Sequence, residues 1–150
     1  MHQSLHLTRN KYAMSANTFK DTIVPVRYKL SALWTSVMFC YIYADYFELY
    51  VPEKVESLIS GENVLNSPLA LFLASVILAI PATLIGFNVL IGPKILRILN
   101  IIFGLFFTIM MLFIAINSLT PWYGFYAFFG LLESGITTTI VLLAWRWPKE

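Results

Sequence analysis

Four long apolar blocks follow one another along the chain, and short polar segments separate them. Each block approaches the roughly 20 residues that a helix needs to cross a bilayer. Apolar residues run continuously through the blocks, whereas the strands of a membrane barrel alternate apolar and polar positions. The pattern therefore predicts four membrane-spanning helices, at about residues 29–50, 67–90, 95–116 and 123–145.

Prolines, glycines and polar runs mark where the predicted helices begin, bend and end. The polar connector VPEKVESLISGENVLN (51–66) separates the first two helices, and its EKVESLIS portion suits a short amphipathic helix at the membrane surface. Pro68 occupies the favourable first turn of the second helix, and Pro81 should bend that helix in its middle. The sequence IGPK (91–94) makes a tight reversal before the third helix.

Composition supports the membrane class. Of the 150 residues, 59% are hydrophobic and only 12% are charged, against a usual charged share of about 25%. A soluble domain of this size could not cover so much apolar surface with polar groups. The predicted fold class is therefore all-α, a polytopic membrane protein whose four-helix transmembrane bundle occupies residues 29–148.

The first 28 residues are predicted to form a basic, mobile tail on the cytoplasmic side. They lack the compact apolar core and the cleavage site of a secretory signal peptide. Translation from Met1 and translation from Met14 both stay open, because all the apolar organisation lies after Met14.

The positive charges predict the direction of the four helices. An even number of spans places both termini on one side, and lysine and arginine favour the cytoplasmic side. Only Lys54 falls on the other side of the predicted membrane, in an acidic connector. Both termini are therefore expected in the cytoplasm. The lysines and arginines on the cytoplasmic side are Arg9, Lys11, Lys20, Arg27, Lys29, Lys94, Arg97, Arg146 and Lys149.

Each predicted helix carries one stripe of small or polar residues on an otherwise apolar cylinder. In membranes, small residues let helix backbones approach closely, and polar side chains form hydrogen bonds across helices. Asn100, Gly104, Thr108, Gly130 and Ser134 fit this packing role. The carboxylates need another explanation, because a charge within the bilayer is costly.

Depth separates the three carboxylates. At a rise of about 1.5 Å per residue, Asp45 and Glu48 lie near the outer end of the first helix, where an interfacial structural role competes with a role in a site. Glu133 lies near the midplane, and no lysine, arginine or histidine shares its depth. Burial without a cation favours its neutral acid form, with Tyr41 as hydrogen-bond partner. A purely structural neutral hydrogen bond is the alternative to a functional role for Glu133.

Five residues form the predicted ligand-binding site. Tyr41, Asp45 and Glu48 share a face of the first helix, and Tyr126 and Glu133 share a face of the fourth. If these two faces oppose each other, they enclose an acidic, aromatic cavity that opens outward. Aromatic rings and carboxylates suit an amine or another cation, and they also suit protons if Glu133 cycles between its charged and neutral forms.

Several chemistries find no support in the sequence. It contains no GxSxG, glycine-rich phosphate loop, HExxH or CxxC motif. Cys40 is the single cysteine, and both histidines, His2 and His6, fall in the tail. We therefore predict no metal, no cofactor and no catalytic residue. The few scattered charges of the tail favour a solvated segment over a nucleic-acid contact.

Four stretches of the chain carry a family resemblance. They are KLSALWTSVMFCYIYADYF (29–47), AIPATLIGF (79–87), RILNIIFGLFFT (97–108) and FFGLLESGITTTIVLLAWRWP (128–148). These stretches resemble an uncharacterised family of small bacterial membrane proteins, catalogued as a domain of unknown function. The resemblance implies a four-helix protein of the bacterial inner membrane and supplies no activity. The general layout is also similar, more weakly, to the DoxX-like proteins.

The predicted function is binding or transport of a small cationic or amphipathic molecule through the acidic cavity. The layout is similar to that of small multidrug transporters, which use a membrane carboxylate in four-span protomers that dimerise. This sequence departs from them because its deep glutamate, Glu133, is in the fourth span. Besides the lipid bilayer and a ligand, the expected partners are a second copy of the chain or other subunits.

Two alternatives to ligand binding stay open. The first is an accessory or assembly subunit of a larger membrane complex, because the aromatic residues of the third and fourth spans could face a partner as well as lipid. The second is a membrane enzyme that acts on a lipid or a quinone, with Glu133 or Asp45 as general acid or base. Only the carboxylates support the enzyme, so a protein without catalytic activity is favoured.

Overall fold

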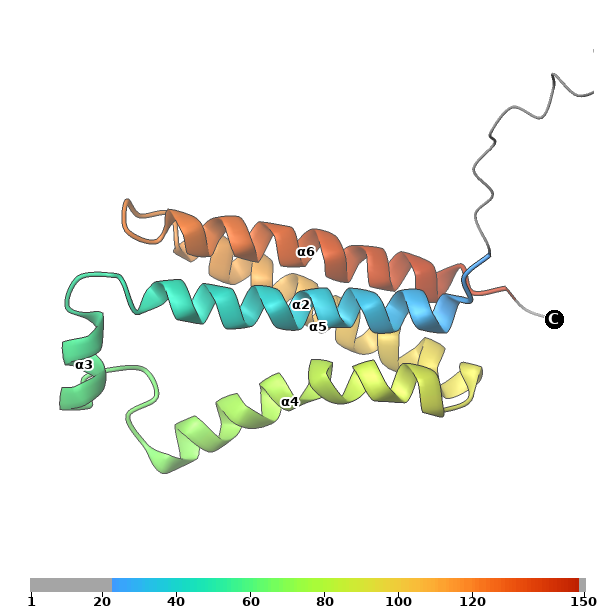
Figure 1. The fold of residues 1–150 in the computed structure, drawn as a ribbon, viewed down its shortest axis with the longest axis horizontal. Coiled ribbons are helices and arrows are strands. Elements are labelled where there is room, and N and C mark those ends of the chain that lie inside the picture. Colours follow the sequence, from blue (N-terminus) through green and yellow to red (C-terminus); the bar gives the residue numbers. More distant parts are fainter. Residues whose placement is uncertain (1–22, 149–150) are drawn as a thin grey trace, which may run out of the picture.

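The protein is all-helical over residues 23–148, the part of the chain that its computed structural model describes (Figure 1). No strand occurs within that part. Four long helices and one short helix follow one another along the chain. They are α2 (Val26–Glu48), α3 (Lys54–Ser60), α4 (Pro68–Leu90), α5 (Pro93–Asn117) and α6 (Gly124–Trp145).

Three of the described helices, α4, α5 and α6, are long and apolar enough to cross a membrane. Helix α2 has 23 residues, as many as α4, but it is less apolar. Its charged residues are Arg27 and Lys29 in the first turns and Asp45 and Glu48 in the last turns. The architecture is therefore compatible with a membrane protein.

The helices begin and end close to the positions that the sequence predicts. Ser67 caps α4 by accepting a hydrogen bond from the backbone N–H of Ala70 at 3.2 Å, and Pro68 is the first residue of this helix, as predicted. The short connector helix is present as α3. The first helix differs, since α2 begins at Val26, directly after Pro25, and not at Lys29.

The last residues of the predicted tail are therefore helical. Residues 1–22, which contain His2, His6 and Met14, lie outside the described part of the chain, as do residues 149–150.

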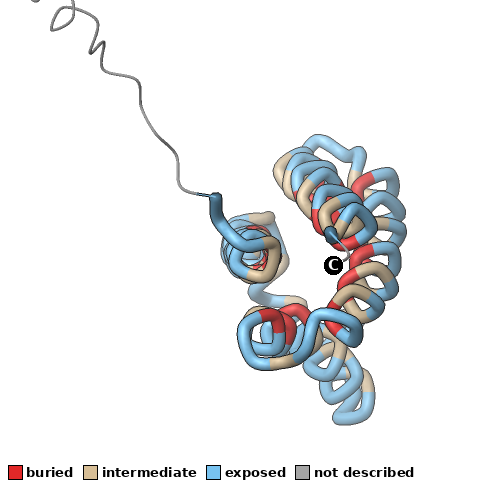
Figure 2. Tube along the Cα trace, turned by 90° about the vertical axis from the view of Figure 1, so that its right-hand side faces the viewer, coloured by how far each residue is buried: buried red, intermediate tan, exposed pale blue. Residues whose placement is uncertain are grey.

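The long helices pack side by side in the order α4, α2, α6, α5 (Figures 1 and 2). Helix α2 therefore lies between α4 and α6, while α4 contacts α5 much less. The start of α2, the turn from α4 to α5 and the end of α6 lie at one end of the molecule, which we call the basic end (Figure 1). Helix α3 and the loop from α5 to α6 lie at the opposite end, the acidic end.

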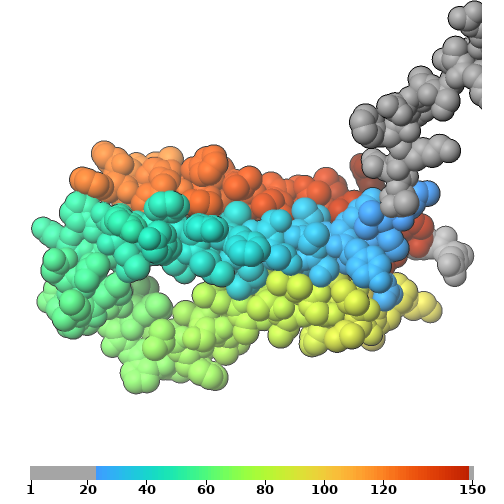
Figure 3. Space-filling model, viewed as in Figure 1, coloured from blue at the N-terminus to red at the C-terminus, as the bar shows by residue number. Residues whose placement is uncertain are grey.

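Helix α4 bends in its middle, which confirms the bend predicted at Pro81 (Figure 1). A proline inside a helix removes one backbone hydrogen bond and pushes against the preceding turn. The buried residues of α4 are Pro81, Leu84 and Asn88, all in its second half. The first half diverges from α2 and leaves a notch in the molecular surface (Figure 3), and its side chains, such as Phe72, are exposed.

A buried group of amide side chains joins three helices near the basic end. The indole Nε1 of Trp34 donates to Oδ1 of Asn100 at 2.8 Å, and Nδ2 of Asn100 donates to Oδ1 of Asn88 at 2.7 Å. The Asn88 and Asn100 amides also donate to the backbone carbonyls of Leu84 and Leu96, each at 2.8 Å. All three side chains are fully buried. Because each hydrogen-bonding group has a partner, this amide cluster fixes the register of α2, α4 and α5.

Two arginines complete the C-terminal ends of helices at the basic end. Arg27 donates from a guanidinium nitrogen to the carbonyl of Val89 at 3.1 Å. Arg97 donates to the carbonyls of Ala144 and Trp145 at 3.2 and 3.3 Å. The last carbonyls of a helix have no partner within the helix, and a cation there is favoured by the helix dipole.

Small residues bring α5 and α6 into close contact, as predicted for the packing stripes. A Cβ atom added to Gly130 would meet the Cβ of Ala115 at 3.0 Å and the carbonyl oxygen of Met111 at 3.1 Å. The hydroxyls of Thr108 and Thr137 are 2.7 Å apart across the same interface. Glycine at position 130 therefore permits this close approach, and a larger residue would push the two backbones apart.

Candidate functional site

Glu133 lies in the middle of α6 and is only 2% exposed. Among the described residues, none forms a hydrogen bond or an ion pair with its carboxyl group; Thr137 contacts the backbone carbonyl of Glu133, at 2.9 Å. A buried carboxyl group without a hydrogen-bond partner is costly. Helix packing therefore explains Thr137, whose hydroxyl contacts the hydroxyl of Thr108. It does not explain the carboxyl group of Glu133.

Tyr41 on α2 is the second buried polar group without a partner. Its side chain is 8% exposed, and its ring packs against Phe107 at a centroid distance of 6.3 Å. Its hydroxyl oxygen is the one fully enclosed side-chain oxygen or nitrogen in residues 23–148 that forms no hydrogen bond. Buried tyrosine hydroxyls usually find a partner.

Tyr41 and Glu133 are buried residues of two helices that pack together, α2 and α6. The two helices pack together and run in opposite directions (Figure 1). Long side chains of a helix lean toward its N-terminus, so Tyr41 leans toward the basic end and Glu133 toward the acidic end. The structure therefore places the two residues that the sequence suggested as partners on neighbouring helices, without a direct hydrogen bond between them.

Asp45 and Tyr126 meet nearer the acidic end of the same helix pair. The Tyr126 hydroxyl donates to Oδ1 of Asp45 at 3.3 Å. Asp45 is exposed, whereas Tyr126 is half-buried. Asp45 lies one helical turn from Tyr41, and Tyr126 lies two turns from Glu133 on the same face of α6. Polar groups therefore extend from the surface toward the buried carboxyl.

Glu48 has a different partner from the other predicted site residues. Its Oε1 forms an ion pair with Nζ of Lys54 at 2.6 Å, and both side chains are mostly covered. Lys54 is the first residue of α3, which follows α2 after a short turn. Glu48 thus anchors the connector, and it is the one site residue whose charge is neutralised by a described cation.

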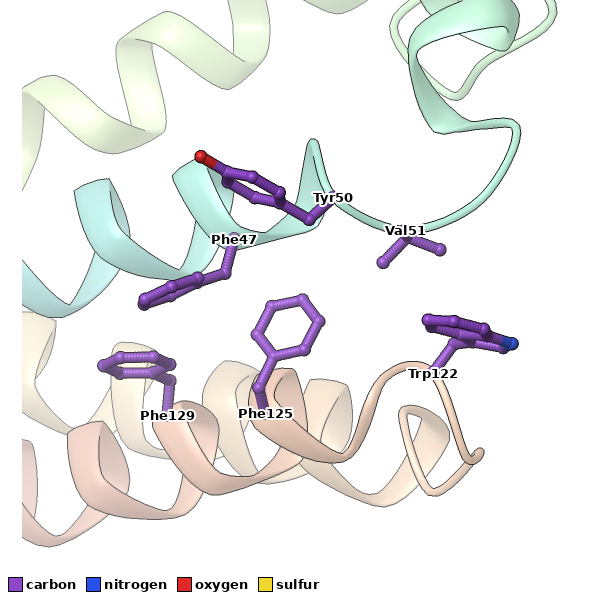
Figure 4. Close-up of a pocket in the computed structure, with 6 residues that line it drawn as sticks. All are labelled: Phe47, Tyr50, Val51, Trp122, Phe125 and Phe129. Atoms are coloured by element: carbon purple, nitrogen blue, oxygen red, sulfur yellow. The ribbon is translucent and has the colours of Figure 1, made fainter.

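An aromatic pocket of about 300 Å³ opens beside these residues, between the end of α2 and the start of α6 (Figure 4). The rings of Phe47 and Phe129 are stacked, with centroids 6.5 Å apart, and the ring of Phe125 meets Phe47 edge to face at 6.2 Å. None of the five predicted site residues lines this pocket. Its lining residues are Phe47, Tyr50, Val51, Trp122, Phe125 and Phe129.

Sequence reasoning missed these lining residues because aromatic side chains near a helix end are already expected at a membrane interface. The spacing of Phe125 and Phe129, one turn apart on α6, was the one available signal. No group of three or more histidine, cysteine, aspartate or glutamate side chains within residues 23–148 is arranged to hold a metal ion.

The fold and these residues define an all-helical protein with three helices suited to a membrane and a buried carboxyl group between two of its helices. The chain belongs to the family of unknown function DUF6326, whose sequence pattern matches residues 24–150. The resemblance to an uncharacterised family is therefore confirmed, and the family description assigns no activity. No curated protein and no solved structure matches the chain.

Proposed function

We propose that this protein is a four-span protein of the cell inner membrane that binds a small cationic amphiphile and carries it through the bilayer. The observation that carries the proposal is the Glu133 carboxyl, 2% exposed and without a hydrogen bond or ion pair to any described residue, together with the fully enclosed Tyr41 hydroxyl that forms no hydrogen bond. A ligand with a positive charge would supply a counter-ion for the Glu133 carboxylate. The same charge would be attracted to the oxygen of the Tyr41 hydroxyl.

The position of α2 between α4 and α6 supports four spans. If α4 and α6 cross the bilayer, α2 occupies the same depth, because it packs along both of them. Its charged residues lie at its two ends, where they reach the interfaces. The described lysines and arginines also divide unequally. Arg27, Lys29, Lys94, Arg97 and Arg146 belong to the basic end, and Lys54 belongs to the acidic end. This division favours a cytoplasmic basic end and therefore cytoplasmic termini.

Cysteine labelling tests this topology. Ile23→Cys, Glu56→Cys and Lys94→Cys are made separately in a Cys40→Ala background and exposed to a membrane-impermeant maleimide in intact cells. We expect only Glu56→Cys to react before lysis, and all three to react afterwards. A protein in which α2 does not cross would instead expose Ile23→Cys together with Glu56→Cys. That result, or labelling of Lys94→Cys in intact cells, would contradict the proposed topology.

The chemistry of the site favours a cation as ligand. Asp45 and Glu133 lie along the contact of α2 and α6, and no described lysine, arginine or histidine pairs with either of them. Tyr41 and Tyr126 place aromatic rings on the same path. Carboxylates next to aromatic faces attract ammonium groups through ionic and cation–π contacts. An anion would meet only like charge here.

Glu133→Gln should weaken binding of a cationic probe, benzyltrimethylammonium, by roughly tenfold or more, because the neutral amide removes an ionic attraction worth about 4 kcal/mol at 4 Å and an effective dielectric constant of about 20. The wild-type affinity should rise with pH as the carboxyl group ionises, and Glu133→Gln should remove this dependence. Isothermal titration calorimetry on protein in nanodiscs of neutral lipid measures both effects. Empty nanodiscs provide the baseline.

The matched control for this experiment is Glu62→Gln, which removes a carboxylate from the exposed connector and should leave the affinity within about twofold of wild type, as expected for a screened surface charge. Glutamine and glutamate have nearly the same shape, so the fold should persist, and the thermal midpoint checks it. If Glu133→Gln left both the affinity and its pH dependence unchanged, the proposed function would be wrong.

A further inference from the structure

The aromatic pocket next to the acidic residues is a second feature that packing alone does not explain. It lies at the level where α2 ends and α6 begins, and the side chains in Figure 4 surround an open space. Five of its six lining residues are aromatic. A volume of about 300 Å³ equals the lower end of the usual range for small-molecule sites, roughly 300–1,000 Å³.

The acidic end of the molecule, where this pocket lies, carries charges of one predominant sign. Within residues 23–148, the acidic end carries five carboxylates and one ammonium group. The ammonium group, Lys54, is held by Glu48, so it does not offset the rest. Aromatic faces are themselves electron-rich and attract cations. The carboxylates are Asp45, Glu48, Glu53, Glu56 and Glu62.

We infer that this aromatic pocket is a binding site for organic cations that carry an aryl or similarly flat apolar group. The apolar group lies against the rings of Phe47 and Phe129, and the positive charge is oriented toward the carboxylates of the acidic end. This inference takes the class of ligand from the proposed function. It adds that the aromatic pocket is the site where the ligand binds first. From here the cation has Asp45 and Tyr126 as the next polar groups toward Glu133.

Two adjacent phenylalanines on α6 provide a matched pair of variants. Phe129 lines the pocket, whereas Phe128 is 62% exposed and does not. Phe129→Ala should lower the affinity for benzyltrimethylammonium by roughly three- to thirtyfold, because it removes an aromatic contact together with buried apolar area. Phe128→Ala should leave it within about twofold, because it removes no part of the lining. Calorimetry in neutral nanodiscs measures both variants.

A second variant tests the pocket without removing a side chain that packs in the fold. Val51→Trp adds a bulky ring to the lining and removes nothing, so it should reduce binding by filling the space. Two analogues of similar shape test the charge. Benzylsulfonate, an anion, and neopentylbenzene, the neutral carbon analogue, should both bind at least tenfold more weakly than the cation.

The outcomes separate this inference from the proposed function. If Phe129→Ala and Val51→Trp leave the affinity unchanged while Glu133→Gln lowers it, the pocket is not the site and the proposed function stands. If the pocket variants lower the affinity and Glu133→Gln does not, the pocket site stands and the role of Glu133 is wrong. Equal binding of neopentylbenzene and the cation would mean an unselective apolar pocket of the kind a lipid chain fills, which overturns the inference.

Discussion

Asn100→Leu is expected to give the largest loss of stability of any single change in the amide cluster. The substitution removes the acceptor of the Trp34 indole N–H and the partner of the Asn88 amide. Both groups stay buried, and each buried polar group left unsatisfied costs about 1–3 kcal/mol. Leucine has the branched shape of asparagine and is larger, so no cavity forms, and the loss of hydrogen bonds dominates the change in free energy of unfolding.

Unfolding in detergent by titration with a denaturing surfactant measures this effect. Asn117→Leu is the matched control, because Asn117 is exposed at the end of the same helix and its side chain contacts only the Phe113 carbonyl, at 2.7 Å. A further variant, Trp34→Phe, removes the indole donor. It should cost less free energy in the Asn100→Leu protein than in the wild type, which a double-mutant cycle detects. The predicted role of the amide cluster would be contradicted if the free-energy costs of Trp34→Phe and Asn100→Leu were additive. It would also be contradicted if the Asn100→Leu protein were as stable as the Asn117→Leu protein.

The helices could be predicted from the sequence because their signals are local. Each long helix coincides with a continuous apolar block. Ser67 and Pro68 mark the start of α4, and the IGPK turn marks the end of α4 and the start of α5. The bend of α4 followed from Pro81 alone. The order of packing could not be predicted in this way. Asn88, Asn100 and Trp34 each lay on a recognisable polar stripe, but their hydrogen bonds depend on which helices are neighbours and at what depth.

The candidate site shows the same division between local and tertiary information. The burial of Glu133 could be predicted from its position in the middle of a helix, and helical spacing placed Asp45 and Tyr41 on one face. The ion pair of Glu48 with Lys54 could not, because it depends on the course of the turn between α2 and α3. The aromatic pocket was missed for a related reason. Whether rings at a helix end enclose a space depends on the angle between two helices, which composition does not specify.

Gly130→Val is expected to separate α5 from α6 and to destabilise the protein by about 1–3 kcal/mol, the usual cost of overpacking. Even the first added carbon would contact the Cβ of Ala115 at 3.0 Å and the Met111 carbonyl oxygen at 3.1 Å. These atoms belong to the backbone or are attached directly to it, so no side-chain rotation relieves the contact. The two helices must move apart, which also stretches the contact between Thr108 and Thr137.

Gly135→Val is the control for this prediction, because a Cβ atom at Gly135 meets nothing within 4 Å. Both glycines lie inside α6, so the effect of a β-branched residue on helix propensity is nearly the same for each. The difference in their free energies of unfolding therefore isolates the contact between α5 and α6. Surfactant titration should find Gly130→Val the less stable of the two. Equal stabilities would mean that α5 and α6 do not approach closely at Gly130. Glu133, one turn further along α6, would then not be buried by this helix pair.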